Sequence, residues 1–246
     1  MNTLLENFVE SVQGVMPGSP LDIVSGIDTA WSHTPAAQVT WLADSLARGY
    51  PEAGRHYWAF RTWGLLVWQP VYLTLAGMHL KRLGISPECI SQQVSHCMVW
   101  GCRIADHTPI EEDEITLLDI TAPRLRACMS TLFQTCNGVL ALHPKAADRL
   151  FADYVMGALL RIKELRQDWS AAHTVDWAER WLTALDLNGA GGLLRYKHDA
   201  GHDQLALDRK VCCLVYKCHD GALCDTCPKI PLAERLAGLA GSRSAT

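Results

Sequence analysis

The sequence has no excess of basic residues and no segment typical of export. Its 246 residues carry 22 Lys and Arg against 26 Asp and Glu, which gives a net charge of −4. This balance argues against a nucleic-acid-binding protein, because such proteins gather basic residues on one face. The first ten residues, MNTLLENFVE, lack the basic and apolar regions of a secretory signal. We therefore expect a cytoplasmic protein with reduced thiols and no nucleic-acid partner.

The chain also lacks the motifs that bind nucleotide cofactors. It contains no GxGxxG and no P-loop, and its glycine-rich stretch at 189–192 has neither the lysine nor the hydroxyl that holds a phosphate. Internal repeats and low-complexity tracts are absent, and no Ser–His–Asp or paired-carboxylate signature stands out. The sequence therefore predicts no site for nucleotide-dependent chemistry.

Residues 63–80 carry no charge and approach the length of a membrane span. This stretch contains Gln69, Pro70 and His79, however, and its content of Leu, Ile and Val is moderate. We predict a buried helix that is kinked or broken at Pro70, and no transmembrane span. A peripheral contact with a membrane surface is the alternative.

Helical periodicity dominates the rest of the chain. Apolar residues recur every three or four positions in several segments, whereas residues 89–105 are rich in Val, Ile and small polar residues and predict a hairpin. We predict a mainly α (α+β) fold, a helical body at 1–200 with a small antiparallel β element, followed by a cysteine-rich segment at 201–246. The expected helices cover about 34–49, 52–68, 123–136, 144–165 and 175–185.

Five of the ten cysteines lie in the short string RKVCCLVYKCHDGALCDTCPK. Cys224 and Cys227 are separated by two residues, a spacing that lets one turn point two thiolates at one metal. Cys212 and Cys213 are neighbours, and neighbours on an extended strand point to opposite faces. A single tetrahedral zinc would therefore need a distorted backbone, whereas a wider [2Fe–2S] cluster takes four thiolates from more divergent directions. The spacing favours the cluster and leaves zinc as the alternative.

The turn dipeptide Asp220–Gly221 adds a geometric constraint. If it closed a two-residue hairpin, Cys213 would lie about 13 Å down its strand from Cys224, which is too far for one cluster. We therefore expect the chain to curl near Cys224, so that the interval between the cysteine pairs folds over the metal as a flap.

The string CC-x10-C-x2-C resembles the C-terminal motif of the FhuF-type ferric-siderophore reductases. The matching residues are Cys212, Cys213, Cys224 and Cys227, and Pro228 and the basic Arg209 and Lys210 also fit. The resemblance implies that these four cysteines hold a [2Fe–2S] cluster. Cys218 is an extra thiol, which could replace Cys212 or Cys213 as a ligand. His219 would resemble a Rieske ligand only with a second suitably spaced histidine.

The resemblance implies a ferric-siderophore reductase that passes one electron from the cluster to bound Fe(III). It favours a hydroxamate siderophore and an external electron donor such as a ferredoxin or a flavin reductase. Two alternatives stay open: a [2Fe–2S] electron carrier or redox sensor without a siderophore site, and a helical interaction module held by zinc. The residues that could face the chelate or the cluster are Arg195, Lys197, His198, His202, Arg209, Lys210 and Lys217.

Overall fold

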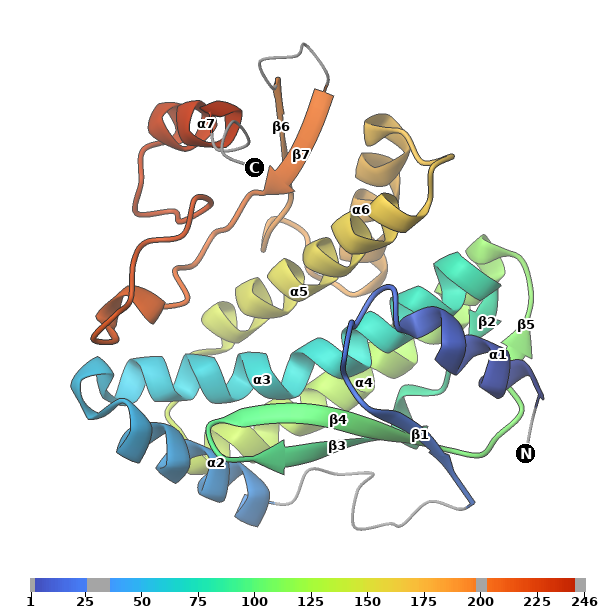
Figure 1. Ribbon diagram of the computed structural model, residues 1–246, viewed down its shortest axis with the longest axis horizontal. Coiled ribbons are helices and arrows are strands. Elements are labelled where there is room, and N and C mark those ends of the chain that lie inside the picture. The colour runs from blue at the N-terminus through green and yellow to red at the C-terminus, as the bar shows by residue number, and fades with distance from the viewer. Residues whose placement is uncertain (1–2, 26–35, 198–202, 242–246) are drawn as a thin grey trace.

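The computed structural model describes residues 3–25, 36–197 and 203–241, and it confirms a mainly α fold with small β sheets (Figure 1). Long helices form the body, and the C-terminal segment lies beside the start of one of them. No described helix is long and apolar enough to cross a membrane. The helices are α1 Thr3–Val12, α2 Ala36–Gly49, α3 Gly54–Ala76, α4 Glu114–Val139, α5 Pro144–Leu165, α6 Ala171–Ala184 and α7 Leu232–Gly241.

The predicted hairpin at 89–105 is confirmed as the antiparallel strands β3 Ile90–Ser95 and β4 Met98–Ala105. β1 Leu21–Val24 joins β4 in parallel and completes a sheet of order β1-β4-β3. This parallel pairing, which joins segments far apart in the sequence, was not predicted. The remaining strands form two-stranded sheets: β2 Leu83–Gly84 with β5 Ile110–Glu111, and β6 Leu193–Lys197 with β7 Asp203–Leu207.

The hairpin of β6 and β7 lies across the predicted boundary at 200/201. Its five antiparallel pairs run from Leu193–Leu207 to Lys197–Asp203, so one hairpin contributes a strand to each predicted unit. A domain boundary placed just before β6 would keep both strands of this hairpin in one unit.

Two helices continue through prolines that the sequence suggested as breaks or starts. α3 runs past Pro70 to Ala76, so the predicted buried helix is confirmed and it is not broken at this residue. α4 begins at Glu114, nine residues before Pro123, and Asp113 caps it by accepting hydrogen bonds from the Ile115 and Thr116 amides at 3.0 and 3.1 Å. Proline costs a helix about 3 kcal/mol. Burial of the flanking helix offsets this cost, since Leu66, Val71 and their neighbours are inaccessible to solvent.

α3 forms the centre of the core and contacts α2, α4 and α5. A second apolar cluster joins α1 to the β1-β4-β3 sheet and to the end of α3. Because both clusters share α3, this helix fixes the positions of the sheet on one side and of α5 on the other.

A fully buried histidine follows α3, in a π-helical turn at Gly77–Lys81. The Nδ1 atom of His79 lies 3.1 Å from Glu114 Oε1, and its Nε2 atom accepts a hydrogen bond from the Trp181 indole at 2.9 Å. Trp169 and Trp177 pack edge-on against the ring, with centroids 5.0 and 4.7 Å away. Burial lowers the pKa of His79, which therefore stays neutral and joins α3, α4 and α6 through its two nitrogens.

We expect His79→Leu to destabilise the fold by about 2–4 kcal/mol, because the Trp181 N–H and the Glu114 carboxylate would both lose a buried partner. Chemical denaturation at pH 7.5 measures the effect. The matched control is His173→Leu, since His173 is exposed and accepts one indole hydrogen bond at 3.1 Å. Its cost should stay below about 1 kcal/mol.

The pH dependence provides an independent readout of the same residue. The unfolded chain protonates His79 near 6.5, whereas the folded chain does so only at lower pH. Wild-type stability should therefore fall as the pH drops below about 6.5, and His79→Leu should lose part of this dependence. Equal losses in the two histidine variants, with an unchanged pH profile, would contradict the assigned role.

Candidate metal centre

The cysteine-rich segment leaves β7 at Leu207 and curls back on itself beside the N-terminal end of α3 (Figure 1). Leu214 adopts a left-handed conformation (φ 64°) directly after the adjacent cysteines, and the 3-10 turn Val215–Lys217 follows. The Gly221 amide then donates to the Cys218 carbonyl at 2.8 Å and closes a tight turn. An ideal Cβ on Gly221 would lie 2.0 Å from the Val215 carbonyl oxygen, so only glycine fits where the flap folds onto itself.

The curl brings the four cysteines of the motif together as two pairs. Cys212 and Cys227 have their sulfur atoms 3.5 Å apart. Cys213 and Cys224 form the second pair, in which each thiol is close enough to shift the pKa of the other. The neighbours Cys212 and Cys213 therefore point to different partners, as adjacent residues on extended backbone must.

Polar groups surround these sulfur atoms. The Leu214 amide donates to Cys212 Sγ at 3.4 Å, and the Arg209 guanidinium donates to Cys224 Sγ at 3.9 Å. The proximity of Cys224, together with the Arg209 charge, lowers the pKa of Cys213 to about 5, whereas the proximity of Cys213 raises the pKa of Cys224. Burial raises the pKa of Cys212 to about 11, so among these sulfurs the negative charge that cysteine carries when it binds a metal is stabilised at Cys213.

These thiols fit a diiron cluster. Two sulfurs on one tetrahedral metal with bonds of about 2.3 Å lie about 3.8 Å apart, close to the separation of Cys212 and Cys227. Each iron of a [2Fe–2S] cluster takes two protein ligands, which matches two pairs of thiols. Across 3–25, 36–197 and 203–241, no three His, Cys, Asp or Glu side chains gather closely enough to surround a single ion.

The same segment matches a known domain. Residues 209–229 fit the family model described as the FhuF 2Fe-2S C-terminal domain. Residues 209–229, hereafter the FhuF-type domain, are similar to this 2Fe-2S domain. The match confirms the predicted resemblance and the [2Fe–2S] cofactor, and it supports a redox role in iron handling. No solved structure matches the chain.

Arg209 connects the FhuF-type domain to the helical body. Its Nε atom lies 3.7 Å from Oδ2 of Asp153 on α5, a carboxylate that is 6% exposed. Burial raises the pKa of Asp153 to about 7, although the Arg209 charge opposes this shift. Neither atom has a hydrogen-bond partner in the described residues. The Arg209 guanidinium therefore lies between the buried Asp153 carboxylate and Cys224 Sγ.

The sequence reasoning named Arg209 but missed Asp153. A signal was available, since Asp153 is the only charged residue between Leu150 and Leu160, on a helix that is otherwise apolar there. An isolated acid on a buried helical face needs a cation, and Arg209 provides it.

Cys218 lies with the flap rather than with the four paired sulfurs. Its thiol lies near Tyr57 on α3, a residue that is 3% exposed, and after burial this proximity is a cause of the raised pKa of Tyr57. The neighbouring His219 amide donates to Glu52 Oε1 at 2.9 Å. These two contacts fasten the flap of the FhuF-type domain to the start of α3.

The other predicted basic residues pair with nearby acids, are exposed to solvent or lie outside the described residues. Lys210 pairs with Asp208 at 2.5 Å, and Lys217 is an exposed residue of the flap. Arg195 and Lys197 are exposed on β6, where Lys197 lies 4.0 Å from Asp203. His198 and His202 lie outside the described residues.

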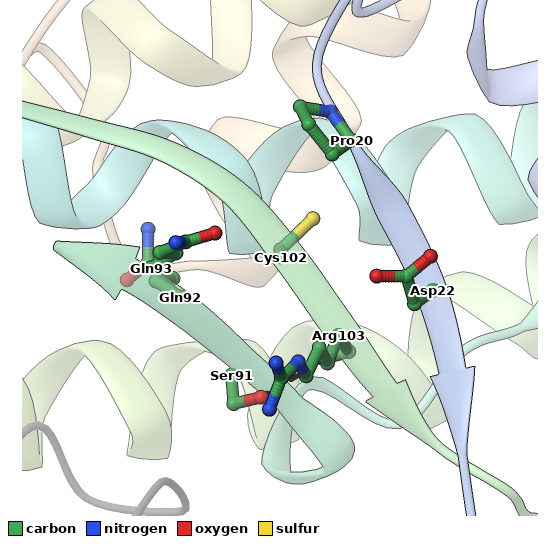
Figure 2. Close-up of a pocket in the computed structure, with 7 residues that line it drawn as sticks. All are labelled: Pro20, Asp22, Ser91, Gln92, Gln93, Cys102 and Arg103. Carbon is green, nitrogen blue, oxygen red and sulfur yellow. Dashed lines mark hydrogen bonds between the residues drawn. The ribbon is translucent and has the colours of Figure 1, made fainter. Parts of the chain in front are cut away.

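Away from the FhuF-type domain, a polar pocket of about 160 Å³ opens on the β1-β4-β3 sheet (Figure 2). The figure shows the Arg103 side chain of β4 beside Ser91 of β3, with Asp22 on the neighbouring strand β1. Its lining residues are Pro20, Asp22, Ser91, Gln92, Gln93, Cys102 and Arg103.

Proposed function

We propose that the protein is a cytoplasmic ferric-siderophore reductase in which Cys212, Cys213, Cys224 and Cys227 bind the [2Fe–2S] cluster. The observation that carries the proposal is the pairing of these four thiols inside the segment that matches the FhuF 2Fe-2S domain. The favoured substrate is a ferric hydroxamate.

The position of the thiols near the surface supports exchange of electrons with other molecules. Cys212, Cys213 and Cys224 are each partly exposed, whereas Cys227 is buried at 1%. Val215 and Leu223 on the flap expose 37% and 41% of their surface. Apolar groups beside a partly exposed cluster provide a contact surface for a chelate or for a donor protein.

The reaction transfers a single electron. A [2Fe–2S] cluster held by Cys212, Cys213, Cys224 and Cys227 would supply one electron at a time, and one siderophore-bound Fe(III) would take it to become Fe(II). Hard oxygen donors bind Fe(II) less well than Fe(III), so other ligands can then capture the metal. An external donor, for which we propose a ferredoxin or a flavin reductase, would supply one electron to the group held by the four cysteines after each turnover.

An anaerobic single-turnover experiment tests this function. Protein reduced with dithionite and freed of excess reductant is mixed with a ferric hydroxamate and a chromogenic Fe(II) chelator. We expect the visible bands of the reduced cluster to revert to those of the oxidised form as an equal amount of Fe(II) appears. The Cys227→Ser variant, treated in the same way, is the control for reduction by residual dithionite.

The alternatives predict other results. A coloured protein that stays reduced with hydroxamate and catecholate chelates would instead be an electron carrier or redox sensor. A colourless protein with zinc and no acid-labile sulfide would be the zinc-held module, and the proposed function would be wrong.

A further inference from the structure

A pocket of about 370 Å³ lies between α3, the start of β4 and α5. Its volume is within the range of small-molecule sites. Trp68 and Trp100 form one wall, with ring centroids 6.5 Å apart, and Tyr72 packs edge-on against Trp68. Met98 and Trp100 are 47% and 42% exposed, so the pocket is open to solvent at the β4 side. The lining residues are Arg61, Leu65, Trp68, Tyr72, Met98, Val99, Trp100 and Tyr154.

The hydroxyl groups of two tyrosines of this pocket pack against glycines of the facing helix. An ideal Cβ on Gly64 of α3 would lie 2.5 Å from the Tyr154 hydroxyl, and one on Gly157 of α5 would lie 2.9 Å from the Tyr72 hydroxyl. Neither hydroxyl has a hydrogen-bond partner within the part of the chain that the structure describes. Burial raises the pKa of both tyrosines, so both remain hydrogen-bond donors at neutral pH.

The same two helices hold the FhuF-type domain. Tyr57, which contacts Cys218, precedes Arg61 by one turn of α3, a rise of about 6 Å. Asp153, which pairs with Arg209, directly precedes Tyr154 on α5. The pocket is therefore next to the cluster segment along both helices, whereas the exposed cations of β6 lie on a separate hairpin.

We propose that this aromatic pocket binds the ferric chelate, and that it takes compact chelates of low net charge. The inference rests on the proposed function, for which it names the substrate site. The aromatic walls would cover apolar ligand surface, and the tyrosine hydroxyls and Arg61 are the lining groups that could donate hydrogen bonds to the oxygen donors of the chelate. Among the described lining residues, Arg61 is the one charged side chain. A trianionic complex would bring three negative charges to a single guanidinium among aromatic rings, and desolvation would oppose its binding.

Gallium(III) complexes are redox-inert, so they measure binding of the chelate without its reduction. The holoprotein is titrated calorimetrically with the gallium complex of a linear trihydroxamate and with a gallium tris-catecholate. We expect the trihydroxamate to bind at least about tenfold more tightly than the tris-catecholate. Trp100→Ala and Arg61→Gln should each weaken trihydroxamate binding by about tenfold or more, with an unchanged EPR signal of the reduced cluster.

Two control variants make the test specific. Trp41→Ala removes an equally exposed tryptophan, 44%, from α2 and should leave binding unchanged. Lys197→Gln tests the basic β6 hairpin and should also leave it unchanged. If the protein reduces ferric trihydroxamate while both pocket variants bind gallium like the wild type, the pocket is wrong and the reductase function stands. Absence of gallium binding, preference for the tris-catecholate, or loss of binding in Lys197→Gln alone would also overturn the inference.

Discussion

Cys224→Ser and Cys227→Ser are each expected to abolish retention of the [2Fe–2S] cluster, whereas Cys218→Ser should keep it. A serine hydroxyl replaces a soft thiolate with a neutral oxygen, which iron–sulfur clusters bind poorly. Loss of a group that only orients a metal ligand already costs about 10–100-fold in metal affinity, so loss of a ligand should cost more than about 100-fold. Cys212→Ser and Cys213→Ser should behave in the same way, because each removes one member of a pair.

Iron and acid-labile sulfide counted per chain, together with visible absorption after anaerobic purification, measure the outcome. Cys218→Ser is the matched control because Cys218 lies in the same FhuF-type domain, is partly exposed like Cys224 and can keep its contact with Tyr57 as serine. Loss of the cluster in Cys218→Ser with retention in Cys212→Ser would show that Cys218 is the ligand in its place.

The cysteine motif was the most predictable part of the site, since its chemistry is local in sequence. Adjacent cysteines must point apart, and a regular hairpin would hold Cys213 and Cys224 too far from each other, so the spacing by itself requires a curl. The flap that produces this curl depends on residues that the spacing does not identify. Leu214 supplies an unusual positive φ, and Gly221 supplies the space for the Val215 carbonyl.

The partners of the residues around the motif depend on tertiary contacts, and the sequence did not predict these partners. Asp153 is 56 positions from its partner Arg209, and Tyr57 is farther still from Cys218. Periodicity identifies which face of a helix is buried but not which partner covers it. The same limit explains the prolines. Pro70 and Pro123 disfavour a helix locally, yet the packed neighbours of α3 and α4 keep both helices continuous.

Arg209→Gln is expected to lower the reduction potential of the cluster, whereas Asp153→Asn should raise it. Reduction adds negative charge beside Cys224, and the Arg209 guanidinium, 3.9 Å from that sulfur, stabilises the added electron. At about 6 Å and an effective dielectric constant of about 20, a unit charge contributes about 3 kcal/mol, on the order of 100 mV for one electron. The nearby Asp153 carboxylate offsets part of this effect, so shifts of tens of millivolts are expected in each direction.

Shifts of the reduction potential with opposite signs in the two variants distinguish an electrostatic role of the Arg209–Asp153 pair from a structural one. Removal of either partner disrupts the Arg209–Asp153 pair, so a purely structural contact would loosen the segment in both variants and shift the potentials alike. EPR-monitored redox titration at pH 7.5 measures the shifts, and Arg149→Gln is the control. Arg149 is a neighbouring guanidinium of α5 that donates to the Lys210 carbonyl at 3.0 Å, and its removal should move the potential least.

The double variant Arg209→Gln, Asp153→Asn should return the potential toward that of the wild type, because it removes one charge of each sign. If both single variants shift the potential in the same direction, Arg209 anchors the segment and does not tune the cluster.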